Sequence, residues 1–295
     1  MDPFIEAEEA TGHSVSRCCE LFEVSRAAYY QRRSHVPSAR EASDAELLEQ
    51  VRQVHAGSDG TYGAPRVHKE LVDRGVVCGR RRVRRLMRQH GIEGRCKKRW
   101  RKTTVQDPAA QAEALDLIQR HFGPSEVLDA RYVGDITYVM TWEGWAYLAT
   151  VIDLASRRVV GWALADHMRT ELVEDALQMA FVQRRPAAGV IFHSDRGSQY
   201  TSGDYAALAQ RHGVVLSVGM AGECWDNAVA ESFFATIKRE LIDTRAWPTR
   251  EGLRTAVFDY IEGWYNTRRL HSSLSYLSPA EYEVQIHYNA DRQAA

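Results

Sequence analysis

Three carboxylates in this sequence have the residue type and the surroundings of ligands for divalent cations. Asp135 lies in the strand-like run "GDITYV", Asp195 ends the buried run "GVIFHSD", and Glu231 lies in the helical pattern "DNAVAESFFATIKREL". Clustered carboxylates repel one another unless a cation lies between them. Ligands that are all oxygens select hard ions, namely Mg²⁺ or Mn²⁺. We therefore predict that the three carboxylates hold such ions together.

Two such ions about 4 Å apart clamp an in-line phosphoryl displacement, because one activates the attacking oxygen and the other stabilises the leaving oxygen. This chemistry belongs to a nuclease or a strand-transfer enzyme, and it needs no serine, cysteine or tyrosine nucleophile. Tyr200, in "HSDRGSQYTS", could instead be the nucleophile of a tyrosine recombinase, but the His and Arg constellation of that class does not surround it. The metal-dependent reaction is therefore favoured.

The elements that must position these residues begin near Leu128. Three strand-like runs form an antiparallel meander and an amphipathic helix follows; then come a short buried strand, a helix, another strand and two long helices. This order is that of an α/β ribonuclease-H-like fold, with a mixed five-stranded sheet flanked by helices. The first and fourth strands of that fold lie side by side, so we expect Asp135 and Asp195 to be neighbours.

The helix after the last strand positions Glu231. At 100° per residue, Asn227, Glu231 and Lys238 fall within about 40° of one another. The adjoining apolar stripe consists of Ala230, Phe234, Ile237 and Leu241. Glu231 therefore stands at the border between the packed and the open face, where it can lean toward the two aspartates. Asn227 could contact substrate or cap the helix, and Asp226 is the better capping residue.

A strongly basic segment precedes this predicted core. Between Gly79 and Lys102 there are twelve Lys or Arg residues and one acid, Glu93, whereas the formal net charge of the whole chain is −1. Such asymmetry indicates a polyanion-binding part attached to an acidic part, although a charge run can also be a solvated face. A short turn followed by an arginine-rich helix is typical of a DNA-reading pair of helices. The DNA-contacting residues that we predict in this segment are Arg80, Arg81, Arg84, Arg85, Arg88, Lys97, Lys98 and Arg99.

The chain divides into segments by these patterns. A break near Val24 separates two short helical patterns at the N-terminal end, which resembles a helix-turn-helix fragment. The predicted segments are a helix-turn-helix-like region over 1–43, an all-α DNA-binding domain over 44–102, a basic linker and connecting helix over 103–127, the catalytic core over 128–285, and a disordered tail over 286–295.

Composition excludes several classes of protein. The 295 residues are 44% hydrophobic and 26% charged, which is ordinary for a globular protein. No stretch approaches the roughly 18 to 20 apolar residues of a membrane span, and the acidic N-terminal stretch is unlike a signal peptide. The five cysteines are odd in number and scattered. They indicate reduced thiols in a cytosol, with neither a disulfide framework nor a zinc site.

Several longer motifs are highly specific in combination. They are "HSVSRCCELFEVSRAAYY", "YGAPRVHKELVDRG", "RRVRRLMRQHGI", "GDITYV", "VIDLASRRVVGW", "HSDRGSQYTS", "GECWDNAVAESFFATIKREL" and "YNTRRLHSSLSYLSPAEY". Through them nearly the whole chain resembles the transposases of bacterial insertion sequences, specifically the second-frame (OrfB) product of the IS-three group. The catalytic core of that family is similar to retroviral integrase.

This resemblance implies a DDE-type, Mg²⁺-dependent polynucleotidyl transferase with two bound ions. Asp135, Asp195 and Glu231 would be its catalytic triad, and Lys238 would contact DNA. The implied reaction is cleavage at the element ends and transfer of the 3′-hydroxyl into DNA, without a covalent protein–DNA intermediate. The implied partners are terminal-repeat and target DNA, further copies of the chain on DNA, and a first-frame (OrfA) product or fusion. The implied location is the bacterial cytoplasm at the nucleoid, away from membranes.

Some features depart from the pattern or stay open. The sequence contains neither a heptad zipper nor the zinc-binding His/Cys domain of retroviral integrases. A DNA-binding repressor with an inactive core is the alternative function, and the arginine-rich helix disfavours a ribonuclease H or a resolvase. Asp153 is favoured as structural, whereas His193 could tune Asp195 or merely pack. The motif "RRLHSSLSYLSP" could face DNA, pack against the core, or do both.

Overall fold

The structure is a computed structural model that describes residues 1–34, 37–95, 127–218 and 228–294. Contacts within the chain divide it into two units, Met1–Glu93 and Gly94–Ala295. No helix in the described ranges has the length and apolar character needed to cross a membrane.

The first unit begins with three short helices. They are α1 (Asp2–Ala10), α2 (Val15–Leu21) and α3 (Arg26–Arg33). Their small core consists of Ile5, Val15, Cys18, Cys19 and Tyr29. The predicted break near Val24 is confirmed, because α2 ends at Leu21 and Ser25 is the N-cap of α3.

Three further helices complete this unit. They are α4 (Ala39–Gly57), α5 (Ala64–Asp73) and α6 (Arg80–Gln89). Ser38 starts α4 with a capping box, in which its Oγ accepts from the Glu41 N–H at 3.2 Å and its own N–H donates to Glu41 Oε2 at 2.7 Å. The segment boundary predicted between residues 43 and 44 therefore falls inside a helix. The cap signal lies five residues before that boundary.

The second unit is built on a mixed sheet of five strands. They are β1 (Arg131–Thr141), β2 (Gly144–Asp153), β3 (Val159–Ala165), β4 (Ile191–Ser194) and β5 (Val215–Val218), in the spatial order β3-β2-β1-β4-β5. The meander β1–β2–β3 is antiparallel, whereas β4 pairs in parallel with both β1 and β5. The α/β sheet expected from the sequence is therefore confirmed.

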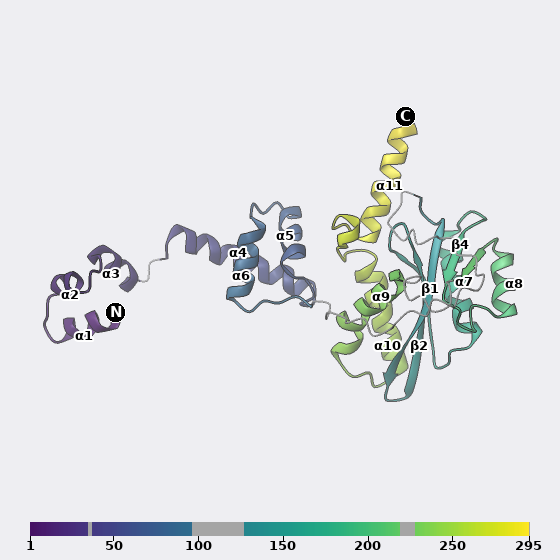
Figure 1. Cartoon of the computed structure of the whole chain (residues 1–295), viewed down its shortest axis with the longest axis horizontal. Helices are drawn as coiled ribbons and strands as arrows, with labels where there is room; N and C mark the ends of the chain where they lie inside the picture. The colour runs from purple at the N-terminus through teal and green to yellow at the C-terminus, as the bar shows by residue number, and fades with distance from the viewer. Residues whose placement is uncertain (35–36, 96–126, 219–227, 295) are drawn as a thin grey trace, which may run out of the picture. The chain divides into compact units, whose positions relative to one another are not determined.

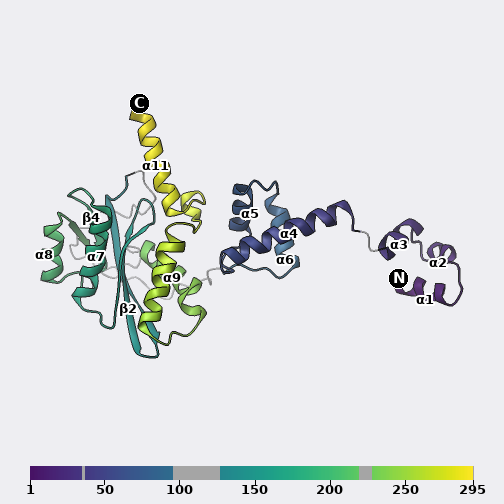
Figure 2. The same cartoon turned by 180° about the vertical axis from the view of Figure 1, so that it is seen from behind.

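Helices cover both faces of this sheet (Figures 1 and 2). On one side lie α7 (Thr170–Arg184) and α8 (Gly203–Arg211), and on the other α9 (Ala228–Glu240) and α10 (Arg250–Phe258). Alternation along β1 supplies both cores, because Val133 packs with the α9 side and Tyr132 with the α7 side. Gly134 is required between them, since a Cβ there would lie 2.2 Å from the ring of Phe192 on β4.

The C-terminal part departs from the regular helix predicted there. Helix α10 passes into a π-helical turn, η2 (Asp259–Tyr265), and helix α11 (Pro279–Ala294) follows after a short 3₁₀ turn, η3 (Ser272–Leu274). The prediction of a disordered tail from residue 286 was wrong for residues 286–294, which belong to α11. Ser278 and Glu281 cap this helix, since the Ser278 N–H donates to Glu281 Oε2 at 2.7 Å. A sparse apolar pattern beyond the cap hid its length.

Candidate active site

Asp135 and Asp195 are brought together by the pairing of β1 with β4. Arg131 pairs with Ile191 and Val133 with His193, a constant offset of sixty residues. The same offset continued by two residues places Asp195 opposite Asp135, just beyond the last paired position. Asp135 also follows Val133 by two residues, so it points to the face of the sheet that α9 covers.

The turn after β4 holds Asp195 at the sheet edge. Its Oδ1 accepts from the Gly197 N–H at 3.0 Å. A Cβ on Gly197 would lie only 3.0 Å from that oxygen, so glycine lets the backbone approach the carboxylate. Ser202 then caps α8, where its Oγ accepts from the Tyr205 N–H at 3.2 Å. The polar run after β4 therefore serves two purposes, a turn around a carboxylate and the start of a helix.

Helix α9 contributes the third carboxylate. The predicted apolar stripe is confirmed for Ala230, Phe234 and Ile237, which are buried against the sheet. Glu231 is solvent-exposed at the border of this stripe. Two turns further on, the Lys238 ammonium lies 5.2 Å from the centroid of the Tyr138 ring on β1. The helix therefore presents an acid and a base on the face that borders β1.

The four charged groups share one electrostatic environment. The pKa of Asp135 is raised from 3.8 to about 7, mainly by burial and also by the nearby carboxylates of Asp195 and Glu231, against the lowering effect of the Ile136 N–H and of Lys238. The Ile136 N–H donates to Asp135 Oδ1 at 2.8 Å. Partial desolvation by the neighbouring side chains also raises the pKa of Glu231. The negative charge that gathers here lacks full compensation from the protein.

These residues fit a hard cation by their chemistry. All three donors are carboxylates, and their mutual repulsion at Asp135 is what a divalent ion would relieve. Within the described ranges, however, no group of three His, Cys, Asp or Glu side chains is already arranged to hold a metal ion. Asn227, the other polar residue predicted near this face, lies outside the described residues.

The arginine-rich helix α6 has two kinds of arginine. Its apolar stripe is confirmed, because Val83, Leu86 and Met87 are buried. Among the predicted DNA contacts, the exposed ones are Arg80, Arg81, Arg84 and Arg88. Arg85 differs, because its Nη2 lies 2.6 Å from Asp44 on α4, and Arg82 Nε lies 2.6 Å from the same carboxylate. Lys97, Lys98 and Arg99 lie outside the described residues.

Three other residues singled out in the sequence are buried. Asp153 accepts from both the N–H and the Oγ of Ser156, at 2.9 and 2.8 Å, which supports the structural role predicted for it. The His193 Nδ1 lies 2.9 Å from Ser217 Oγ on β5. Tyr200 packs among the aromatic rings under α8, and burial raises its pKa well above 10. A buried phenol cannot reach a DNA backbone, which disfavours a tyrosine recombinase.

Two contacts near α9 were not foreseen from the sequence. One is the placement of Tyr138 under Lys238. The other is a buried ion pair between Glu240, at the end of α9, and Arg269. The available signal for the ion pair was a charged residue, Glu240, at a position that the helical period makes internal.

Models of known protein families match most of this chain. The model described as "HTH-like domain" matches residues 42–100, and two models described as "Integrase core domain" match residues 129–224 and 231–286. The last two ranges contain Asp135 and Asp195 in one case and Glu231 in the other. The matched ranges follow the helical unit and the sheet unit described above.

Individual relatives are similar over almost their full length. The "Transposase InsF for insertion sequence IS3A" of Escherichia coli (strain K12) is 37% identical over 286 residues, which cover 95% of this chain and 97% of that protein. The "Insertion element IS600 uncharacterized 31 kDa protein" of Shigella sonnei is 37% identical over 272 residues, which cover 92% of this chain and 99% of that protein.

Proposed function

Because this chain belongs to the insertion-sequence transposases that carry an integrase core domain, we propose that its core cuts DNA at the ends of its element and joins the resulting 3′-hydroxyl to another phosphodiester. The observation that carries the proposal is the β1–β4 pairing, which places Asp195 beside Asp135 on the face that α9 covers. The raised pKa of Asp135, to which burial and the carboxylates of Asp195 and Glu231 contribute, supports it. Such a concentration of uncompensated negative charge, beside a lysine, is typical of a metal-dependent phosphoryl-transfer site.

Asp135, Asp195 and Glu231 are the proposed ligands of Mg²⁺ or Mn²⁺, with two ions as the expected number. When bound, such ions activate the attacking oxygen and stabilise the leaving oxygen. The β1–β4 pairing supports this role because it aligns the two aspartates, while α9 brings the glutamate to the same face. Lys238 is the proposed contact to the DNA phosphate next to the reacting bond, which its position over Tyr138 supports.

Helix α6 is the proposed DNA-binding element of the first unit. Its exposed arginines can pair with phosphates, whereas Arg82 and Arg85 are held by Asp44 and stabilise the packing of α6 on α4. On α6, the DNA contacts that we retain as proposals are Arg80, Arg81, Arg84 and Arg88. Self-association on DNA, a first-frame partner and action at the bacterial nucleoid belong to the same proposal.

A repressor with an inactive core is the competing function, and strand transfer separates the two. Purified protein is incubated with Mg²⁺ and the DNA ends that flank its own gene, and joined products are resolved on a denaturing gel. We expect joining of the 3′-ends without any protein–DNA adduct after heating. Specific binding to these ends without cleavage or joining would support the repressor instead.

A further inference from the structure

Helix α9 has a back face opposite its candidate catalytic face. Glu231 and Lys238 are seven residues apart, which puts them on one face, and Phe233 and Glu240 are also seven residues apart. The second pair is offset from the first by two residues, or about 200° around the helix axis. What holds Phe233 and Glu240 therefore determines how α9 turns its front face toward β1.

An aromatic contact holds the back face near its middle. The ring of Tyr265 lies 4.8 Å from the ring of Phe233, in edge-to-face geometry. Tyr265 is buried and also meets the ring of His271 edge-to-face at 4.9 Å. The guanidinium of Arg269 lies 5.7 Å from the Tyr265 centroid. This stack lies two residues from Glu231 along α9.

A buried ion pair holds the same face at the end of the helix. Arg269 Nη2 donates to Glu240 Oε1 at 2.8 Å and Arg269 Nε donates to Glu240 Oε2 at 2.9 Å, which is two-pronged pairing. The hydroxyl of Tyr260 donates to Glu240 Oε2 at 2.8 Å. Arg269 is 5% exposed and Glu240 is 7% exposed, so water competes little with these directional bonds.

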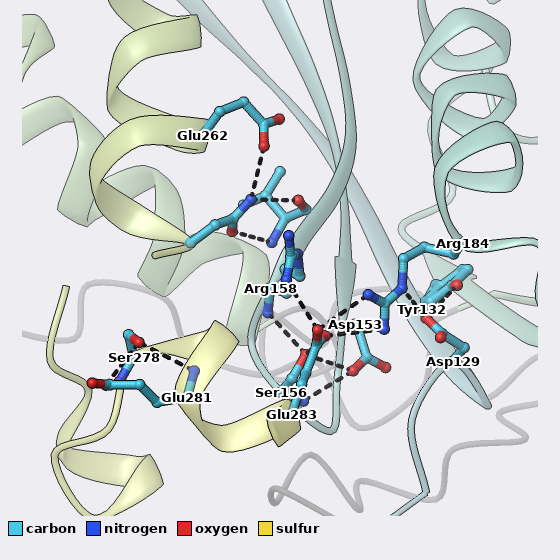
Figure 3. Close-up of polar contacts among 12 residues, drawn as sticks. Asp129, Tyr132, Asp153, Ser156, Arg158, Arg184, Glu262, Ser278, Glu281 and Glu283 are labelled. Atoms are coloured by element: carbon cyan, nitrogen blue, oxygen red, sulfur yellow. Dashed lines mark hydrogen bonds and ion pairs between the residues drawn. The ribbon is translucent and has the colours of Figure 1, made fainter. Parts of the chain in front are cut away.

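Residues 260–269, which contact the back face of α9, are themselves bound to the edge of the sheet. The Asn266 side chain pairs with both backbone groups of Val159 on β3, accepting from the N–H at 3.0 Å and donating to the C=O at 2.9 Å. Glu262 accepts from Trp162 Nε1 on the same strand at 3.3 Å. Because β3 is an edge strand, Asn266 occupies the place of a further strand. The Glu262 side chain, labelled in Figure 3, also accepts from Asn266 Nδ2 at 3.4 Å.

We propose that Tyr260, Tyr265, Asn266 and Arg269 form a clamp that sets the rotation of α9, and that Arg269 is a positioning residue for Glu231 and Lys238. Contacts to two side chains seven residues apart on one face of a helix resist rotation about its axis, and their separation along the axis also resists tilting. A carboxylate lies about 6 Å from the helix axis, so a 20° rotation moves it by about 2 Å. Displacements of this size are enough to cost about 100-fold in rate. The proposal rests on the catalytic roles proposed above for Glu231 and Lys238.

The test compares two matched substitutions, Arg269→Lys and Arg184→Lys. Lysine keeps the charge but cannot form the two-pronged bond. Arg184 is also a mostly buried arginine that pairs with two acids, Asp129 at 2.8 Å and Glu283 at 3.0 Å, neither of which lies on α9 (Figure 3). For each variant we would measure hydrogen exchange of the α9 amides, the affinity for end DNA, and the kcat and KM of end joining.

We expect Arg269→Lys to speed exchange in α9 by about tenfold and to lower the kcat of joining by at least about tenfold, with DNA affinity within about twofold of wild type. Arg184→Lys should change neither α9 exchange nor kcat. Unchanged exchange in α9 of Arg269→Lys would overturn the clamp, and wild-type kcat despite faster exchange would overturn the positioning role.

A second variant covers the case in which Arg269→Lys does not fold. The double substitution Glu240→Leu with Arg269→Met replaces the buried charges by apolar side chains of similar volume, an exchange that proteins often tolerate. It removes the directional bonds, so α9 exchange should again rise and kcat fall, and wild-type values of both would refute the clamp. If the wild-type protein itself joins no ends, the proposed catalysis fails, and the exchange comparison still decides whether the clamp holds α9.

Discussion

At the scale of single residues, the candidate site depends on Asp135, a carboxyl group whose surroundings disfavour its ionised form. Asp135 is half-buried on strand β1 beside two further carboxylates, and its pKa is raised to about 7. A carboxyl group that is costly to ionise in the free protein is expected at a site that binds a cation. Structure alone gains little from such an arrangement, since an asparagine would fill the same volume without the charge.

The raised pKa of Asp135 predicts how stability depends on pH in the absence of metal. The folded protein holds a proton on Asp135 up to about pH 7, whereas the unfolded chain loses it near pH 3.8, so stability falls as pH rises through this window. The fall is up to about 4 kcal/mol. Asp135→Asn should remove it, which makes the variant more stable than wild type at pH 8. Melting curves in EDTA at pH 5 and pH 8 measure the effect, and parallel pH slopes for the two proteins would contradict it.

Much of the site could be predicted from residue types and spacing. Asp135 in a strand, Asp195 at a strand end and Glu231 on the border of an amphipathic helix are local patterns, and the structure gives each of them that setting. Pairings between distant residues could not be predicted in this way. The ion pairs of Arg85 with Asp44 and of Arg269 with Glu240 depend on how helices pack, and no local period encodes the partner.

At the scale of elements, the arginines of helix α6 differ in exposure and in their partners. Exposed Arg81, Arg84 and Arg88 follow the helical period along one side, while Arg85 turns to Asp44 on α4. The sequence alone made all of these arginines candidates for DNA contacts. The packing of α6 on α4 separates the exposed arginines from Arg85, which is paired with Asp44.

Salt dependence of DNA binding tests the exposed arginines. Each phosphate contact releases condensed counterions, so replacing Arg81, Arg84 and Arg88 by alanine should flatten the plot of log affinity against log salt by roughly one unit per lost contact. Arg85→Ala is the control. It should lower the melting temperature of the first unit and change the salt slope little. An unchanged slope for the triple variant would mean that α6 does not face DNA.

The sheet and its layers were predictable because strand and helix periods are strong over the core. The π-helical turn at Asp259–Tyr265 was not, since its residues read as a continuation of α10. Its function in the fold is to bring Glu262 and Asn266 to β3 together, a tertiary contact. Helix α11 was missed for a similar reason, because Glu283 is held by Arg158 and Arg184 from other elements (Figure 3).

At the scale of the whole molecule, the proposed reaction would require more than one copy of the chain. Insertion joins two element ends to one target, so at least two cores must act together. The sequence contains no heptad zipper that would hold copies together in free solution. We therefore expect assembly on DNA, where each end recruits its own copy and paired ends bring the copies into contact.

Light scattering with and without end DNA measures this assembly. The free protein should have the mass of a single chain, and addition of paired ends should produce complexes that hold two or more chains. A DNA of the same length without element ends serves as the control. A single chain that stays monomeric on paired ends while still joining them would contradict the expectation.

The substitution Glu231→Gln tests most directly whether Asp135, Asp195 and Glu231 form one metal-dependent catalytic centre. The change keeps the volume and the helix, but an amide oxygen is a weaker ligand for a hard cation. Strand transfer is measured in Mg²⁺ and in Mn²⁺, with Lys238→Ala as a control that should weaken DNA binding before it weakens stabilisation by metal. We expect joining by Glu231→Gln to fall by at least about 100-fold in Mg²⁺ with end-DNA affinity and folding retained. Joining at the wild-type rate in both metals would show that Glu231 is not a ligand and that the catalytic assignment is wrong.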